Sequence, residues 1–262
     1  MSISIDEIIK QLRLMDDEFM TAVFDNNIED TQLVLRIITG IDDLEVTEVI
    51  SQREVKNLKG RSVRLDVLAK DSDDKRYDIE VQRTDSGAIP ERARYNSSLL
   101  DGSIVETGAK FKDLPETYVI FITENDVMEA NLPIYHIERV VMETGKMFCD
   151  REHIIYVNGA TEEDSDIGRL MHDFKQSNPD KMYFAGLAKS ARYFKEEGGR
   201  LKMCKLVEDY VKQELEEERD DLLAEGRTEG LISSIKLLLK KMTPDEIVEL
   251  GFSKEEVAMA QK

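Results

Sequence analysis

Two stretches between Val63 and Gln82 alternate between apolar and polar residues. In the first stretch every second residue from Val63 to Ala69 is apolar, and residues 77–82 repeat the pattern. Alternation with a period of two is typical of half-buried strands. The residues between them, Asp-Ser-Asp-Asp-Lys at 71–75, are turn formers. The pattern therefore predicts a β-hairpin.

A hairpin turn centred on Asp73 would place Asp66 directly opposite Glu80, with Gln82 one step further along the same face. Directly paired residues on antiparallel strands have Cβ atoms only ~5 Å apart, and like charges placed there destabilise the sheet. Two such carboxylates need a cation, or one of them must keep a proton. Mg²⁺ uses one or two carboxylates together with waters, so it would meet this need. The alternative is an ordinary hairpin whose polar face is solvated.

Helices and strands alternate along the rest of the chain. Apolar residues at helical or strand spacing predict helices over Ile5–Leu14, Asp30–Thr39, Pro90–Leu100, Ile167–Phe174 and Met182–Phe194, and strands over Val46–Gln52, Thr117–Thr123, Ile134–Met142 and His153–Val157, with a loop over Thr144–Asp150. A long charged helix follows over Leu201–Leu223, and Gly226 and Gly230 are expected to interrupt it. Two capping boxes, which begin at Thr243 and Ser253, predict a small helical module at the end.

Five short motifs occur in a characteristic order. They read DDEFMTAVF at 16–24, RLDVLA at 64–69, IEVQ at 79–82, RARYNS at 92–97 and TYVIFI at 117–122. In order and spacing they resemble the PD-(D/E)XK nuclease superfamily, and most closely its transposase-associated branch, the recombination-promoting nuclease (Rpn) family. The resemblance covers roughly residues 10–195. It implies an α/β fold with a restriction-endonuclease-like core, in which helices flank a central mixed sheet, and a helical C-terminal extension.

The resemblance also implies a metal site that holds Mg²⁺ or Mn²⁺. Asp66 matches the metal-binding aspartate of the superfamily, and Glu80 matches the acidic residue of the (D/E)XK motif. The backbone carbonyl of Val81 often completes such a site. Gln82 stands where the superfamily usually has lysine, and a glutamine orients water by hydrogen bonding without adding charge. The proline of the motif is also replaced, because Leu65 precedes Asp66.

Further acids and basic residues are candidates to assist this site. In the superfamily an acid on the first helix can assist the metal, which makes Asp17 or Glu18 a candidate. The alternative is a pair of helix N-terminal acids favoured by the macrodipole. The predicted helix over 90–100 either presents Arg92 and Arg94 to phosphate, which their planar guanidinium groups suit, or is an ordinary amphipathic surface helix. Other basic residues near the site in sequence are candidate DNA contacts: Arg53, Lys56, Lys59, Arg61, Arg64 and Arg83.

The net charge of −19 argues against a simple nucleic-acid-binding protein, because phosphate neutralisation by basic residues supplies most non-specific DNA affinity. Ten acids and three basic residues lie between Glu208 and Glu229, so the remainder still carries −12. Two distant cysteines imply no disulfide framework. No apolar run reaches ~18 residues, and no signal-peptide pattern opens the chain. Together these features predict a cytoplasmic protein that does not span a membrane.

Two functions follow from these observations. The first is a metal-dependent DNA endonuclease of the Rpn type, in which Asp66 and Glu80 hold the metal and Gln82 orients water. The second is a catalytically weak or inactive nuclease-fold protein that acts as a protein-interaction module. The intact acid pair favours the enzyme, while the acidic net charge and Gln82 favour the rival. The expected organisation is a nuclease-like domain at 1–195, an acidic helical linker at 196–230 and a helical tail at 231–262, with homo-oligomer formation through the C-terminal helices.

Overall fold

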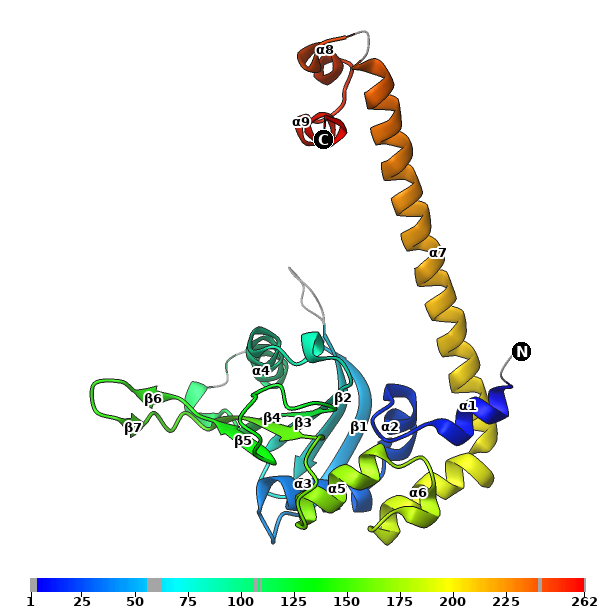
Figure 1. Cartoon of the computed structure of the whole chain (residues 1–262). Helices are drawn as coiled ribbons and strands as arrows, with labels where there is room; N and C mark the ends of the chain where they lie inside the picture. The colour runs from blue at the N-terminus through cyan, green and yellow to red at the C-terminus, as the bar shows by residue number, and fades with distance from the viewer. Residues whose placement is uncertain (1–3, 56–62, 106–107, 109, 240–241, 262) are drawn as a thin grey trace. The chain divides into compact units, whose positions relative to one another are not determined.

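A computed structural model describes residues 4–55, 63–105, 108, 110–239 and 242–261 (Figure 1). The chain divides into two compact units, Met1–Val207 and Glu208–Lys262. The helices are α1 (Ile5–Gln11), α2 (Asp17–Phe24), α3 (Ile28–Thr39), α4 (Pro90–Ile104), α5 (Asp166–Lys175), α6 (Ala185–Glu196), α7 (Arg200–Leu238), α8 (Pro244–Glu249) and α9 (Lys254–Ala260). The strands are β1 (Val46–Val55), β2 (Val63–Asp71), β3 (Arg76–Gln82), β4 (Thr117–Thr123), β5 (Ile134–Ile137), β6 (Val140–Val141), β7 (Lys146–Met147) and β8 (Glu152–Asn158).

The first unit is built on a six-stranded mixed sheet with the strand order β1-β2-β3-β4-β8-β5. Strands β1, β2 and β3 pair antiparallel, whereas β3, β4 and β8 pair in parallel. The parallel step from β3 to β4 is made through α4, as parallel strands require a long crossover. The predicted α/β architecture, a central mixed sheet flanked by helices, is confirmed.

Asp71 organises the turn between β2 and β3. Its Oδ1 accepts the backbone N–H groups of Asp73 (3.0 Å) and Lys75 (2.9 Å), and its Oδ2 accepts the hydroxyl of Tyr77 (2.8 Å). Asp74 adopts a left-handed backbone with φ of 69°, which aspartate tolerates better than most residues. These bonds fix the turn at the predicted centre, and the strands therefore pair in a single register, from Lys70 opposite Arg76 to Val67 opposite Ile79.

Helices cover both faces of the sheet (Figure 1). Helices α1, α2, α3, α5 and α6 pack on one face, where their apolar side chains join Val67, Ile79 and Ile120 in the larger core. Helix α4 covers the other face, where Ala93 and Leu100 pack against Val119, Phe121 and other apolar residues. The polar side chains of the hairpin that face α4 are consequently enclosed between the sheet and this helix.

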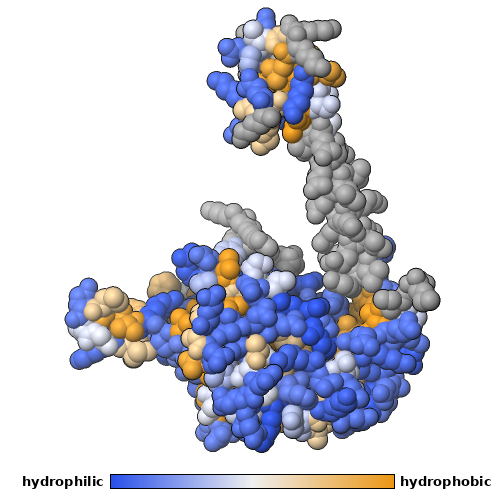
Figure 2. Space-filling view, in the orientation of Figure 1, coloured by the Kyte–Doolittle hydropathy of each residue, from blue (hydrophilic) through white to orange (hydrophobic). Residues whose placement is uncertain are grey.

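Most elements begin and end close to their predicted positions, with two differences. The first lies over residues 134–150. The predicted strand over Ile134–Met142 divides into β5, in the main sheet, and β6, and the predicted loop over Thr144–Asp150 contains β7, which pairs with β6 in a small separate hairpin. Met142 and Phe148, at and beside this hairpin, are exposed, and Figure 2 shows apolar surface on the protruding β6–β7 part of the molecule. The described part of the chain has no helix that is both long enough and apolar enough to cross a membrane.

The second difference is that α7 continues through Gly226 and Gly230 instead of breaking there. A glycine costs a helix only about 1 kcal/mol relative to alanine, which the propensity of flanking residues can offset. In the second unit the end of α7 packs with α9 around Ile235, Val257 and Ala260, and α8 contacts α9. Both predicted capping boxes are confirmed: Glu246 and Glu256 bond back to the N-cap backbones of Thr243 and Ser253.

Candidate active site

Asp66 and Glu80 lie next to one another on the central hairpin. The pairing of β2 with β3 runs as far as Val67 opposite Ile79, the residues directly adjacent to these two acids. The backbone N–H of Asp66 donates to Glu80 Oε1 at 3.4 Å, and the backbone N–H of Val81 donates to Asp66 Oδ2 at 3.1 Å. Asp66 is 7% exposed and Glu80 is fully buried. The juxtaposition expected from a turn centred on Asp73 is confirmed.

A cavity of about 410 Å³ opens beside this pair. Asp66, Val81 and Gln82 line it from the sheet, and Asp17 lines it from the first turn of α2. The remaining lining residues are Met15, Arg64, Arg83 and Arg92. Packing of α2 against the sheet thus brings one of the two candidate acids of the first helix to the hairpin acids. The other candidate, Glu18, does not line the cavity.

Burial dominates the electrostatics of the acid pair. It raises the pKa of Asp66 well above its usual value, and the negative charges of Glu80 and then Asp17 raise it further. Burial also raises the pKa of Glu80, against the opposing effect of the Arg92 guanidinium. Both shifts have the direction expected for crowded carboxylates that lack solvent. A bound cation would relieve the repulsion and favour the ionised forms.

Arg92 contacts the acid pair from α4. Its Nη2 lies 2.8 Å from Glu80 Oε2, and its Nη1 donates to Gln82 Oε1 at 3.2 Å. Gly87 leaves room for the Gln82 amide, because a Cβ at Gly87 would lie 2.1 Å from Gln82 Oε1. Nothing in the local sequence distinguishes Gly87 from other turn glycines, so its contact with Gln82 is evident only in the structure. Arg94 is exposed two residues further along α4.

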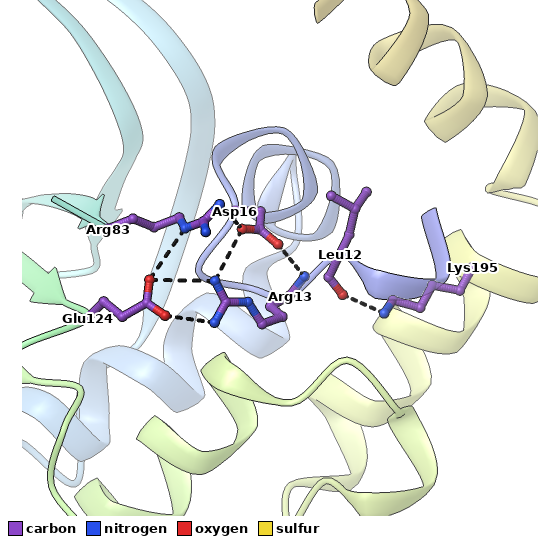
Figure 3. A network of polar contacts seen from close by, with 6 residues as sticks. All are labelled: Leu12, Arg13, Asp16, Arg83, Glu124 and Lys195. Carbon is purple, nitrogen blue, oxygen red and sulfur yellow. Dashed lines mark hydrogen bonds and ion pairs between the residues drawn. The ribbon is translucent and has the colours of Figure 1, made fainter. Parts of the chain in front are cut away.

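A network of two arginines and two acids joins the start of α2 to the ends of β3 and β4 (Figure 3). Arg83 Nη1 lies 2.9 Å from Asp16 Oδ1, and its Nε lies 3.3 Å from Glu124 Oε2. Arg13 Nη1 lies 2.7 Å from Glu124 Oε1, and the Arg13 backbone N–H donates to Asp16 Oδ2 at 2.7 Å. The network holds Asp16 against the sheet and thereby positions the neighbouring Asp17 at the cavity.

Lys195 binds the segment just before Arg13, beside the same network, through the carbonyl of Leu12 (Figure 3). Lys195 is 4% exposed, and its ammonium group donates to the backbone carbonyls of Lys10, Leu12 and Ser177. It also lies 5.0 Å from the centroid of the Phe19 ring. Burial lowers the pKa of Lys195 to about 8. The sequence shows Lys195 only as one more charge near the end of α6.

Asp78 is a third acid on the face covered by α4, and the sequence analysis missed it as a buried group. It is fully buried two residues before Glu80, and neither of its carboxylate oxygens has a hydrogen bond within 3.5 Å in the described part of the chain. Burial, then the charges of Glu80 and Asp66, raise its pKa well above the usual value, while the nearby Asn96 amide opposes this rise. The alternation that predicted the strand assigned Asp78 to its polar face, but α4 encloses that face.

The candidate DNA contacts have differing environments. Arg64 is 52% exposed and lies 3.6 Å from Asp17, and Arg83 is 57% exposed, so both guanidinium groups reach solvent beside the cavity. Arg53 belongs to β1. Lys56, Lys59 and Arg61 lie outside the described residues.

The donor set fits a hard divalent cation. No cluster of three or more His, Cys, Asp or Glu side chains in the described ranges is arranged to hold a metal ion, but Mg²⁺ needs only one or two carboxylates beside its waters. Asp66 and Glu80 would supply these carboxylates, and the Val81 carbonyl would be a further oxygen donor. Asp17 Oδ1 is a buried oxygen at the same cavity with no hydrogen-bond partner among the described residues. A buried carboxylate oxygen that has no hydrogen bond to the protein, next to an acid pair, is in the environment expected of a cation ligand.

Comparison with known families gives one match. Residues 33–163, half of the 262-residue chain, match the profile of the family described as PD-(D/E)XK nuclease family transposase. The matched region extends from α3 to the turn after β8 and includes the whole hairpin and α4. Searches of curated proteins and of solved structures each found no significant match.

Proposed function

The chain belongs to the PD-(D/E)XK nuclease family transposases, and from this premise we propose that it is a metal-dependent DNA endonuclease of the Rpn type. The observation that carries the proposal is the buried Asp66–Glu80 pair, of which Asp66 lines a cavity that Asp17 and three arginines also line. Members of the superfamily hydrolyse phosphodiester bonds, and a role in promoting recombination follows from the resemblance to the Rpn branch.

Each residue at the cavity has a proposed role in hydrolysis. Asp66, Glu80 and the Val81 carbonyl hold Mg²⁺ or Mn²⁺, with Asp17 as an auxiliary acid. The bound cation supplies positive charge to the reacting phosphate and to the attacking water. Gln82 would orient that water through its amide. The water oxygen would add to phosphorus as the P–O bond to the leaving strand breaks, with one water proton passing to solvent and the leaving oxygen taking up a proton from solvent. Gln82 stands where the superfamily usually has a positively charged lysine. Because glutamine adds no charge, the reaction would depend more strongly on the metal.

Arginines around the cavity are the proposed DNA contacts. Arg64 and Arg83 line the cavity and reach solvent, so they can exchange their acidic partners for phosphate. Arg94 is exposed on α4 and extends this basic surface. Guanidinium groups bind phosphate oxygens in a bidentate manner that suits the task. The proposed DNA-binding set is thus Arg64, Arg83, Arg92 and Arg94.

Plasmid nicking tests the proposal. Purified full-length protein is incubated with supercoiled plasmid in Mg²⁺, in Mn²⁺ and in chelator, beside Asp66→Ala, Glu80→Ala and the control Asp73→Ala, which removes an exposed acid of the same hairpin. We expect metal-dependent nicking that both site substitutions reduce by at least about a hundredfold and that the control retains. Absence of nicking with both metals, or nicking that survives both site substitutions, would refute the proposed site.

A second function is favoured by different observations. Gln82 replaces the usual lysine, the net charge is −19, and apolar residues are exposed on the β6–β7 hairpin. These features suit a weak or inactive nuclease-fold protein that binds other proteins. The nicking experiment separates the two functions, because a folded protein that binds no metal and cuts no DNA would support this alternative.

We also propose that the C-terminal helices mediate association with a second copy of the chain. Leu237, Leu250 and Met259 are each more than half exposed in a small unit whose own core is formed by few residues. In this scheme residues 1–195 carry the nuclease function, 196–230 form the acidic helical linker and 231–262 form the associating tail. Light scattering of the full chain measures its mass, and a monomer at micromolar concentration would contradict this assignment.

A further inference from the structure

Glu80 has no exposed oxygen with which to receive a metal ion. Its side chain is fully buried, its Oε2 lies 2.8 Å from Arg92 Nη2, and its Oε1 accepts the backbone N–H of Asp66. Among the described residues that line the cavity are Asp66 and Arg92, but not Glu80. The guanidinium therefore occupies the side of Glu80 on which a cation shared with Asp66 would bind.

Arg92 is the only basic residue with an ion pair to the hairpin acids 66, 78 and 80 within the described ranges. Arg64 pairs with Asp17, and Arg83 pairs with Asp16 and Glu124. A divalent cation between Asp66 and Glu80 would lie in contact range of a guanidinium of like charge, and such charges repel strongly in a site with little water. The cation and Arg92 thus compete for the same carboxylate.

Building on the proposed metal site, we infer that Arg92 is the resident counter-ion of Glu80 and that a divalent cation binds only when the guanidinium leaves Glu80. Arg92 is half-exposed, and its other bond is to the flexible amide of Gln82, so its side chain can leave without movement of α4. Once released, the guanidinium remains at the cavity wall and is free to bind a phosphate. Metal loading therefore makes Arg92 available to the DNA backbone.

Metal affinity tests the inference without any measurement of cleavage. Titration calorimetry gives the dissociation constant of Mn²⁺ for the full-length wild type and for Arg92→Met, with Arg94→Met as a control that removes an exposed arginine of the same helix. Removal of the competitor should tighten Mn²⁺ binding by about tenfold or more in Arg92→Met. The control should change the dissociation constant by less than about twofold. Unchanged or weaker binding in Arg92→Met would overturn the inference.

A Mn²⁺ titration of Asp66→Ala distinguishes failure of the Arg92 inference from failure of the proposed metal site. If Asp66→Ala weakens Mn²⁺ binding at least about tenfold while Arg92→Met does not tighten it, the metal site stands and the competition is refuted. If Asp66→Ala binds as the wild type does, the ion lies elsewhere, and both the proposed metal site and the inference built on it fail.

A measurement on the wild-type chain covers the case in which Arg92→Met does not fold. The Nε–H resonance of Arg92 in ¹H–¹⁵N spectra, identified by its loss in Arg92→Lys, reports the environment of the guanidinium. Saturation with Mg²⁺ should shift this resonance and speed its exchange with water, and the Arg94 resonance should not change. An Arg92 resonance that stays in place while Mg²⁺ saturates the Asp66-dependent site would overturn the inference.

Discussion

At the scale of single residues, buried polar side chains differ in whether their hydrogen bonds are satisfied. Asp78 and Asn96 are both fully buried, and the oxygens of Asp78 have no hydrogen bond within 3.5 Å in the described part of the chain. Lys195 is almost equally buried, yet three backbone carbonyls accept its ammonium group. Burial of a charge is costly unless its hydrogen bonds are satisfied. We therefore expect substitutions at Asp78 and Lys195 to change stability in opposite directions.

Replacement of Asp78 by asparagine should stabilise the protein at neutral pH. The raised pKa means that the folded chain binds the Asp78 proton more tightly than the unfolded chain. Between the unfolded pKa and the raised folded pKa the wild type therefore loses stability as pH increases, and Asp78→Asn does not. We expect a gain in the free energy of unfolding of about 1 kcal/mol or more at pH 7, which shrinks towards pH 4.

Urea denaturation at pH 4.5 and pH 7 measures this gain. Asp73→Asn is the matched control, because it removes an exposed acid of the same hairpin, and its effect should stay within about 0.5 kcal/mol. A gain for Asp78→Asn that is equal at both pH values would contradict the protonation argument, and a loss at pH 7 would contradict the burial argument.

Replacement of Lys195 by methionine should destabilise the protein by about 2–4 kcal/mol, because it leaves partly buried carbonyls at the end of α1 and after α5 without their donor. Thermal or urea unfolding measures the change. Lys189→Met removes an exposed lysine of the same helix and should have little effect. If Lys195→Met unfolds with the wild-type midpoint, the ammonium contacts contribute no net stability.

At the scale of elements, the turn between β2 and β3 determines where the acids of the site lie. The Asp71 carboxylate bonds to two backbone N–H groups and to Tyr77. A shift of one residue in the pairing would move Asp66 away from Glu80 and reverse which side chains face α4. The geometry of the site is consequently coupled to a carboxylate that lies outside the cavity.

Asp71→Ala should lower the free energy of unfolding by about 2–3 kcal/mol, since it leaves the hydroxyl of Tyr77 and turn N–H groups without their acceptor. Mn²⁺ affinity should fall with it if the register becomes heterogeneous. Ser72→Ala, at the exposed neighbouring position, is the control and should retain both properties. Wild-type stability of Asp71→Ala would mean that strand pairing alone fixes the register.

At the scale of the whole molecule, the net negative charge limits the affinity for DNA. A net charge of −19 repels a polyanion, so affinity depends on a local basic surface instead of the average field. Around the cavity this surface consists of arginines that are largely paired with acids: Arg64 with Asp17, Arg83 with Asp16 and Glu124, and Arg92 with Glu80. Binding to phosphate exchanges one anionic partner for another, which lowers the gain from each contact.

The salt dependence of DNA binding should therefore be shallow. In chelator, Arg92 remains with Glu80, and the described residues near the cavity offer Arg64, Arg83 and Arg94 to phosphate. Three contacts give a slope of log K against log salt concentration of about −3. Fluorescence anisotropy of a labelled duplex between 50 and 200 mM KCl is sufficient for this measurement. A slope of about −6 or steeper would show that further basic residues contribute, and would direct attention to Lys56, Lys59 and Arg61.

The sequence by itself determined the hairpin, and it predicted the pairing of Asp66 with Glu80 for a turn centred on Asp73, a centring that the structure supplied. Period-two alternation and a turn rich in aspartate act over a few residues, so their consequences can be worked out without the rest of the fold. The order of motifs likewise indicated the mixed sheet and the family. The capping boxes of α8 and α9 are local for the same reason.

Only the tertiary structure decided which other groups meet the pair. Asp17 reaches the cavity and Glu18 does not because α2 packs on the sheet in one orientation. Arg92 pairs with Glu80, and Asp78 is buried, because α4 covers a strand face that alternation alone assigns to solvent. The ammonium group of Lys195 contacts the carbonyls of Lys10 and Leu12, which lie more than 180 residues away in the sequence. Such contacts depend on how whole elements pack together, and the spacing of residues along a single element carries no information about that packing.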